Sequence, residues 1–503
     1  MERVKTLFCS KAFIYILIGL FSLLLACLSD SYDYDLYARL IVGENFFKTG
    51  WITYKDFLSY TPTHTWYDHE WGASVIFYAF FKMFGSFGLI LVQAITLFFT
   101  TFFVIKTQQL QGRAYPTTYF FLMLFMLLFA HQNPNIVRCH MFSFMFFSML
   151  LYLLEKTRLH QSKALWVMPL VFLLWNNIHG GVVAGLGIVF VYMLAAIFSK
   201  KPWFTYFGVL AVSTPLLVIN PYGLDYLQFL FSANTMHRKF INEWWAVFAY
   251  KHILYYFPVF CFVMFGFLLK MYDFLNKRFD FIKISVLTVT VYLGIVHIKL
   301  LSLPIIVISA LFYNDLMRLF NKDFVKSLNK LCVVLMISSV LYIPFTHPFV
   351  TRLSFYKYPI LEVEFIKQNN IKGNILTNFG LGSYIAYKLY PNNLIYMDGR
   401  YEEVYNNKEF ENLYHYEVVD EQWQNAIKDY PTEILMPNKE VEVYKKLQND
   451  SDWEEVYTGP VCGIFLPKHR DRYKPPFKLP SKDIKYYEEH DFDNLGYFGK
   501  SRE

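Results

Sequence analysis

Residues 12–43 read AFIYILIGLFSLLLACLSDSYDYDLYARLIVG, an apolar run that ends in a cluster of acidic side chains. The run is long enough to cross the hydrocarbon core of a bilayer as a helix. Asp33 and Asp35 follow it where the chain would leave the membrane, and residues 68–70, Asp-His-Glu, come later in the same loop. Ionisable side chains beside hydrocarbon are costly, so their clustering at one membrane face indicates a functional site.

The composition also predicts a membrane protein with several spans. Of the 503 residues, 55% are hydrophobic and only 17% are charged, and the mean hydropathy is +0.28. A chain this long and this apolar does not fit a single soluble core. Its six cysteines are scattered singly, so neither a disulfide framework nor a cysteine metal site is expected.

About eleven segments are long and apolar enough to cross the bilayer, if some are short or tilted. They cover residues 12–29, 88–105, 116–130, 141–154, 164–177, 181–198, 204–219, 253–269, 281–296, 300–317 and 331–345. Lys and Arg gather in alternate loops between these segments, which makes that side cytoplasmic by the positive-inside rule. We therefore expect the N-terminus inside the cell and the C-terminal segment outside it.

The first external loop contains two amphipathic stretches with helical spacing, one from Asp35 and one from Asp68. The first is expected to lie flat on the membrane surface. Asp68 could simply cap the second helix, and Asp56 could be a turn residue. In an extended exit segment, Asp33 and Asp35 would point the same way. Such carboxylates could act as a general base or share a divalent cation, or they could be solvated loop residues.

Beyond Phe345 the composition becomes mixed and charged, which marks a domain boundary. A strand at 374–378, a helix at 383–389 and a strand at 394–397 predict a parallel βαβ unit. The pair Gly380-x-Gly382 lacks the third glycine of a dinucleotide-binding turn, so no nucleotide cofactor is expected. Further elements are predicted as helices at 408–416, 422–429 and 439–449 and strands at 433–436, 453–458 and 462–466.

The predicted fold is thus an α-helical polytopic membrane domain followed by a small extracytoplasmic α/β domain. The membrane domain covers residues 1–346 and includes a large first external loop, 30–87. The α/β domain covers residues 347–467. The last residues, 468–503, are rich in charged residues and proline and are expected to be loosely ordered.

Several motifs occur in a fixed order along the chain. They are Asp33-x-Asp35-Leu-Tyr-x-Arg39, Trp66-x-x-His69-Glu70-Trp71, Arg138-x-His140-x-Phe142-Ser143, Asn177-x-His179-Gly180-Gly181, Glu243-Trp244 and Asp398-Gly399-Arg400. With them, the chain resembles bacterial polytopic proteins of the GT-C glycosyltransferase class. Those proteins are similar to protein mannosyltransferases and aminoarabinose transferases.

The resemblance implies a transferase that moves a hexosyl or pentosyl group from a polyprenyl-phosphate-linked donor. The implied acceptor is a glycan, lipid or protein at the external face of the inner (plasma) membrane. Asp33 or Asp35 matches the position of the class's catalytic base. Membrane lipids are expected partners and nucleic acid is not. The class has metal-dependent and metal-independent members, so a divalent cation stays possible.

A leaving phosphate must be stabilised by cations or a metal in a partly dry site. Candidate substrate-binding residues lie in the first loop and at the ends of later spans: Arg39, Asp56, His69, Glu70, Arg138, His140, His179 and Arg238. Arg138 is the preferred phosphate ligand because guanidinium geometry matches phosphate, although it could instead snorkel to lipid headgroups. His179 could be a helix cap, and Arg238 could only touch anionic lipid. His64, Asp68, His69 and Glu70 match no defined metal spacing.

Two other functions fit the membrane composition. A transporter or flippase of lipid-linked saccharides would also use charges within the membrane, but the sequence shows no duplicated halves. A non-catalytic membrane protein of envelope assembly is the second alternative.

Overall fold

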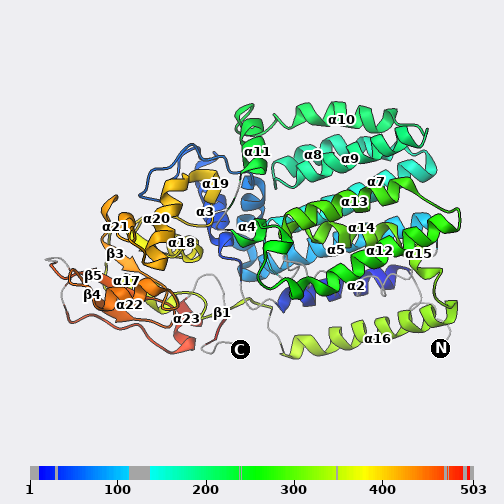
Figure 1. Ribbon diagram of the computed structural model, residues 1–503. Helices are drawn as coiled ribbons and strands as arrows, with labels where there is room; N and C mark the ends of the chain where they lie inside the picture. The colour runs from blue at the N-terminus through cyan, green and yellow to red at the C-terminus, as the bar shows by residue number, and fades with distance from the viewer. Residues whose placement is uncertain are drawn as a thin grey trace. The chain divides into compact units, whose positions relative to one another are not determined.

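The computed structural model describes residues 11–28, 32–112, 136–236, 238, 241–346, 349–469, 473, 475–490 and 496–498. The chain folds as two compact units (Figure 1). The helical unit comprises Met1–Leu28 and Ile90–Phe349, and the mixed unit comprises Ser29–Leu89 and Val350–Glu503. The first external loop, predicted as part of the membrane domain, therefore clusters with the C-terminal segment.

The described part of the helical unit is mainly α-helical. Its α-helices are α2 (Lys11–Cys27), α5 (Ser86–Gln111), α7 (His140–His160), α8 (Met168–Asn176), α9 (Val182–Phe198), α10 (Phe204–Leu216), α11 (Asp225–Thr235), α12 (Phe257–Leu275), α13 (Phe281–Val296), α14 (Ser302–Leu311), α15 (Tyr313–Met317) and α16 (Lys322–Thr346). The predicted span at 116–130 lies outside the described residues, and the other predicted spans each overlap a helix.

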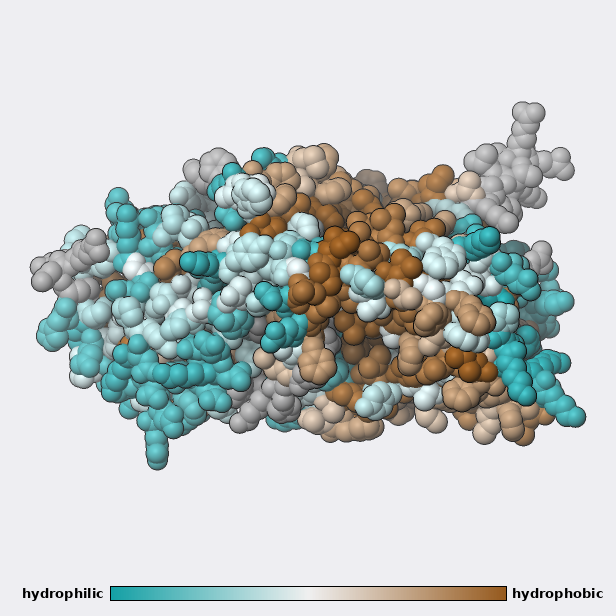
Figure 2. Space-filling model, turned by 90° about the horizontal axis from the view of Figure 1, so that it is seen from above, coloured by the Kyte–Doolittle hydropathy of each residue, from teal (hydrophilic) through white to brown (hydrophobic). Residues whose placement is uncertain are grey.

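Among the described residues, three helices are long and apolar enough to cross a membrane: Ser86–Gln111, Ile253–Leu275 and Lys322–Phe345. The remaining apolar helices are shorter, so the expected number of about eleven spans stays a prediction. In Figure 2, brown apolar side chains cover much of the visible face of the helical unit, whereas teal polar side chains cover the mixed unit. Large side chains such as Phe198, Leu275 and Phe345 are exposed on these helices, as expected for surfaces that face lipid.

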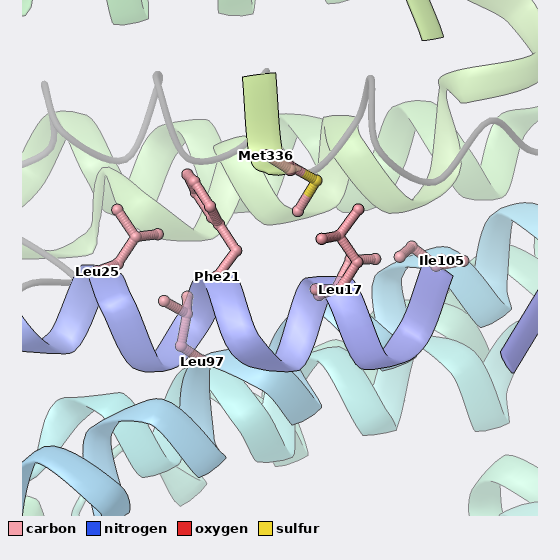
Figure 3. Packing of buried hydrophobic residues seen from close by; sticks show 7 residues of the cluster. Leu17, Phe21, Leu25, Leu97, Ile105 and Met336 are labelled. Carbon is pink, nitrogen blue, oxygen red and sulfur yellow. The ribbon is translucent and has the colours of Figure 1, made fainter. Parts of the chain in front are cut away.

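Helix α2 packs between two other helices of the helical unit. Leu17, Phe21 and Leu25 lie along one of its faces, and Leu97 of α5 and Met336 of α16 contact the same cluster (Figure 3). The first apolar run is thus a helix that packs against α5 and α16.

Buried charges in the helical unit are paired with one another. Lys270 Nζ lies 2.6 Å from both Asp273 Oδ2 and Asp315 Oδ2, and Lys283 Nζ lies 3.2 Å from Asp315 Oδ2. Lys270 is 2% exposed. Because an unpaired buried charge is strongly unfavourable, these ion pairs are what allows the lysines to be buried. Lys270 and Lys283 lie near the ends of predicted spans, where the orientation argument would count them as loop charges, but the structure places both in the protein interior.

The mixed unit begins with two closely packed helices, α3 (Asp35–Thr49) and α4 (Trp71–Phe84). Gly43 of α3 has no room for a Cβ, because that atom would overlap the Ser74 carbonyl and the Tyr78 side chain. Both helices overlap the stretches predicted to be helical in the loop, but α3 is buried on all sides from Leu36 to Gly43 rather than along one face as expected for a helix lying flat on the membrane. The C-terminal helices are α17 (Ile360–Gln368), α18 (Gly382–Leu389), α19 (Tyr401–Val404), α20 (Asn407–Val418), α21 (Asn425–Lys428), α22 (Glu442–Gln448) and α23 (Ile484–His490).

A four-stranded sheet in the order β2-β3-β5-β4 forms the centre of the C-terminal segment. Its strands are β2 (Ile375–Thr377), β3 (Ile434–Met436), β4 (Trp453–Thr458) and β5 (Gly463–Pro467). Strands β2 and β3 are parallel, and the other neighbours are antiparallel. A separate parallel pair joins β1 (Arg352–Ser354) and β6 (Gly496–Phe498).

The first loop extends this sheet. In the predicted strand 394–397, Ile395 forms isolated parallel bridges, one with Ile375 of β2 and one with Ser59 of the loop. The Ile395 N–H donates to the Leu58 carbonyl at 2.9 Å, and the Tyr60 N–H donates to the Ile395 carbonyl at 3.1 Å. These backbone bonds explain why the loop belongs to the mixed unit.

Glu362 of α17 is a buried carboxylate that supports the turn between β4 and β5. It accepts the backbone N–H groups of Val461 at 2.7 Å and Cys462 at 2.8 Å. Burial raises the pKa of Glu362 to about 7, although these two hydrogen bonds oppose the shift. The folded protein therefore holds this proton to a higher pH than the unfolded chain does.

We expect the Glu362→Gln variant to be less sensitive to pH than the wild type. The stabilisation that protonated Glu362 provides is complete below pH 4.5, the ordinary pKa, and is lost as the pH rises through about 7. The wild type should thus lose about 3 kcal/mol relative to Glu362→Gln between pH 4.5 and pH 8. Thermal unfolding in detergent measures this difference. Glu364→Gln, on the same helix but partly exposed, is the control, and equal pH slopes in wild type and Glu362→Gln would contradict the assignment.

Candidate active site

Asp33 and Asp35 occupy different positions at the start of α3. The Asp33 Oδ1 atom accepts the backbone N–H of Asp35 at 3.0 Å, and Asp35 lies in the first helical turn. The expected extended exit segment is a turn instead, since Tyr34 has helical backbone angles, φ −61° and ψ −35°. The prediction that alternation points both carboxylates the same way is therefore wrong. The Asp33 side chain thus supports the turn that leads into α3, and Asp35 lies within the helix itself.

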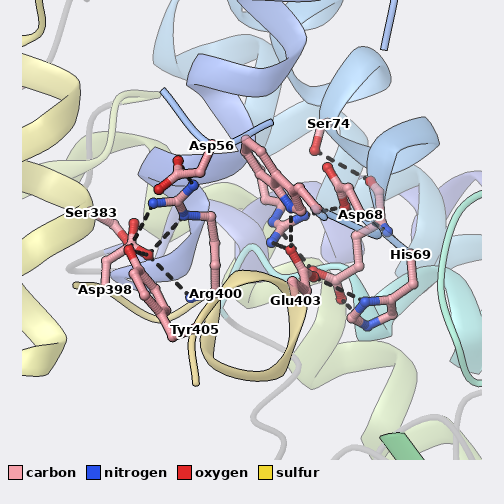
Figure 4. Close-up of polar contacts among 12 residues, drawn as sticks. Asp56, Asp68, His69, Ser74, Ser383, Asp398, Arg400, Glu403 and Tyr405 are labelled. Atoms are coloured by element: carbon pink, nitrogen blue, oxygen red, sulfur yellow. Dashed lines mark hydrogen bonds and ion pairs between the residues drawn. The ribbon is translucent and has the colours of Figure 1, made fainter. Parts of the chain in front are cut away.

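Arg39, one turn further along α3, is the centre of a buried ion cluster, and its partners Asp68 and Glu403 are labelled in Figure 4. Its guanidinium forms an ion pair with Asp68, and its Nη2 lies 2.9 Å from Glu403 Oε2. Its Nε lies 3.3 Å from Glu70 Oε2. The His69 Nδ1 atom lies 2.9 Å from Glu403 Oε1. We call these five residues the Arg39 cluster; four were singled out from sequence, whereas Glu403 was not.

The Arg39 cluster carries more negative than positive charge. Burial raises the pKa of Asp68, and the nearby carboxylates of Glu403 and Glu70 add to the rise against the pull of Arg39. Burial also opposes the charge on Glu403, but Arg39 and His69 outweigh it and hold the pKa of Glu403 below its usual value. The carboxylates of Asp68, Glu70 and Glu403 thus surround one permanently charged cation, Arg39. This excess of negative charge favours the binding of a further cation.

Three members of the cluster could hold a divalent cation. His69, Glu70 and Glu403 each offer a ligand atom, and these atoms all lie within 4.8 Å of one another. Imidazole and carboxylate ligands suit zinc and manganese. His64, considered with them in the sequence, is exposed and interacts with the carbonyl of Thr65. The donor set fits a cation, and Arg39 already neutralises part of its charge.

Arg400 is the centre of a second buried cluster in the mixed unit (Figure 4). Its Nη1 lies 2.6 Å from Asp56 Oδ1 and its Nε 2.8 Å from Asp398 Oδ1. Its Nη2 donates to the Tyr405 hydroxyl at 2.9 Å. Burial disfavours charge on Asp56, but the charge of Arg400 and hydrogen bonds from Arg400, Ser59 and the Leu58 N–H outweigh it and hold the pKa of Asp56 below its ordinary value.

Asp56 is also a turn residue, as one of its sequence interpretations suggested. Its Oδ1 accepts the backbone N–H of Leu58 at 3.0 Å, in addition to the bond from Arg400. The carboxylate of Asp56 is therefore engaged within the protein. This arrangement favours a structural role for Asp56 over direct contact with a substrate.

The candidate cations at the span ends belong to the helical unit. Arg138 Nη1 lies 2.8 Å from Glu243 Oε2, so the best predicted phosphate ligand has a carboxylate partner. The next residue, Trp244, is contacted by two cations. Its ring centroid lies 3.7 Å from the guanidinium carbon of Arg238 and 3.1 Å from the Lys299 Nζ. Glu243 and Trp244 thus gather Arg138, Arg238 and Lys299 into one cationic group.

The two histidines singled out in the helical unit have different surroundings. His179 Nδ1 accepts the backbone N–H of Gly181 at 3.0 Å and lies 2.7 Å from Ser143 Oγ, so it caps the turn before α9. His140, at the start of α7, is 8% exposed, and its ring contacts Phe144. The capping interpretation of His179 is therefore supported by its contacts.

Neither a protein-family model nor a curated protein matches this sequence. The fold is similar to a solved structure, the crystal structure of ArnT from Cupriavidus metallidurans bound to undecaprenyl phosphate. The similarity covers 92% of this chain and 98% of that chain, with a TM-score of 0.53 and 12% sequence identity. At this identity the likeness concerns the fold alone, and it supports the GT-C-like architecture expected from the motifs.

We expect Arg39→Ala to destabilise the protein strongly. The substitution leaves Asp68, Glu70 and Glu403 without their shared cation, and removing one partner of a buried ion pair costs about 3–5 kcal/mol. Lys48→Ala is the control, because Lys48 on the same helix pairs with Glu44 at the surface, where such pairs contribute about 0–1 kcal/mol. Thermal unfolding in detergent compares the two. Equal melting temperatures would mean that the Arg39 cluster does not stabilise the mixed unit.

Proposed function

We propose that this chain is an integral-membrane glycosyltransferase that moves a sugar from a polyprenyl-phosphate-linked donor to an acceptor at the external face of the inner membrane. The observation that carries the proposal is the Asp35 carboxylate, held in the first turn of α3 one turn before the buried Arg39 cluster. The likeness to ArnT, whose structure contains undecaprenyl phosphate, supports a polyprenyl phosphate as the carrier.

In the proposed reaction, Asp35 accepts the proton of an acceptor hydroxyl. The acceptor oxygen then forms a bond to the anomeric carbon of the sugar. The bond between that carbon and the phosphate oxygen breaks, and the polyprenyl phosphate leaves with the electron pair. A carboxylate suits this task because it can take the proton as the oxygen attacks. Asp33 would position Asp35 through the hydrogen bond to its backbone N–H.

A polyprenyl phosphate is an anion whose binding requires positive charge, and the cationic group is the candidate for it within the helical unit. Arg138, Arg238 and Lys299 supply three cations around Glu243 and Trp244, so the group keeps a net positive charge. An arginine guanidinium can bind phosphate through two parallel hydrogen bonds. A phosphate would compete with Glu243 for Arg138.

Asp35→Asn should lower sugar transfer by about 10²–10⁴-fold, because the amide cannot take the proton. Asp33→Asn is the matched control: its side-chain oxygen can still accept the Asp35 N–H, so transfer should stay within a few-fold of wild type. Mass spectrometry of envelope glycans and lipid-linked sugars from a deletion strain expressing each variant provides the measurement. Unchanged glycans in both variants would contradict the proposal that the protein is a glycosyltransferase.

Arg138→Gln should weaken the binding of undecaprenyl phosphate by about 10-fold or more, since a charge-assisted bidentate contact is lost. Binding to the purified protein in detergent can be followed by native mass spectrometry. Arg318→Gln is the control, because Arg318 is half exposed on the helical unit and pairs with Asp315 at 3.4 Å. Equal affinities of the two variants would remove Arg138 from the phosphate site.

A further inference from the structure

The Asp35 carboxylate lies directly against the backbone of Gly399. A Cβ at position 399 would overlap Asp35 Oδ1 and would lie 2.8 Å from its Cγ and 3.5 Å from its Oδ2. The backbone at Gly399 does not have the positive φ at which glycine is favoured, so close approach is the reason that a larger residue does not fit. The carboxylate thus occupies the space that any side chain at position 399 would need.

The residues on both sides of Gly399 are fixed to each other. Asp398 Oδ1 accepts the backbone N–H of Arg400 at 3.3 Å and its Nε–H at 2.8 Å. Ser383 Oγ donates to Asp398 Oδ2 at 3.0 Å. Asp398 and Arg400 are almost fully buried, so little solvent competes for these bonds. The turn is therefore a rigid support.

The same turn is held from two further directions within the mixed unit. Arg400 reaches Asp56 at 2.6 Å and Ser59 at 3.2 Å, and both belong to the loop that follows α3. On the other side, a Cβ at Gly382 of α18 would overlap the Met397 carbonyl and lie 2.9 Å from the Asp398 Cβ. The position of Gly399 is thus determined by α18 and by the first loop together.

We infer that the turn Asp398-Gly399-Arg400 positions the Asp35 carboxylate for proton abstraction, with Gly399 as the surface against which it rests. The inference rests on the proposed role of Asp35 as the base. Gly399 is a positioning residue, because it acts through Asp35. This positioning role would make the C-terminal segment part of the active site, whether or not that segment also binds the acceptor. A displacement of about 1 Å can cost on the order of 100-fold in rate.

Gly399→Ala tests the inference in a double-mutant cycle with Asp35→Asn. In the wild-type background we expect kcat for sugar transfer to fall about 10-fold to 100-fold with little change in KM for the lipid-linked donor. In the Asp35→Asn background the added Gly399→Ala should leave the residual rate unchanged. Gly380→Ala is the matched control, because its Cβ would meet only the Tyr34 ring, at 3.7 Å or more. Thermal unfolding confirms that each variant folds.

If Gly399→Ala retains the wild-type kcat while Asp35→Asn is inactive, the inference is wrong and the proposed function still holds. An equal fold-loss in both backgrounds would also overturn it, because the effect would then not pass through Asp35. No transfer by the wild type, or full activity of Asp35→Asn, would overturn both proposals. If Gly399→Ala fails to fold, Ser383→Ala removes one hydrogen bond to Asp398, and its smaller loss of kcat must likewise disappear with Asp35→Asn.

Discussion

The mixed unit depends on the requirement that a buried guanidinium be matched by carboxylates. Arg39 and Arg400 are each almost fully buried, and each takes partners from both parts of the unit. Arg39 of the first loop pairs with Glu403, and Arg400 of the C-terminal segment pairs with Asp56. Each arginine would be costly to bury if the other part were absent. The ion pairs Arg39–Glu403 and Arg400–Asp56 thus join segments that are distant in sequence into one folded unit.

The order of elements in the C-terminal segment could be predicted from sequence because it follows local signals. Alternating apolar residues and turn residues mark β2, α18, β3, α22, β4 and β5, and the structure has all of them within a few residues of their expected bounds. The predicted strand at 394–397 is reduced to bridges at Ile395. The helices α3 and α4 were likewise visible as amphipathic patterns.

Which charged side chains meet could not be predicted. The sequence marked Asp33, Asp35, Arg39 and residues 68–70 as a cluster, but no periodic pattern connects them with Glu403. A hint lay in Asp398-Gly399-Arg400, a charged motif that directly precedes the short helix α19 to which Glu403 belongs. The different positions of Asp33 and Asp35 were also hidden, because they depend on the helical turn at Tyr34 and on the hydrogen bond from the Asp35 N–H to the Asp33 side chain.

The backbone bridge between Ser59 and Ile395 has a consequence for the synthesis of the chain. Residues 29–89 emerge from the ribosome before their partners, and the helical residues 90–349 must be made in between. At common elongation rates this interval lasts on the order of ten seconds to a minute. Through that time the loop has neither its sheet neighbour nor the carboxylate of Glu403, so a nascent chain that stops within the helical unit would leave α3 with a buried arginine only partly neutralised. The C-terminal segment, which is translated after the helical residues, thus completes the fold of the first loop.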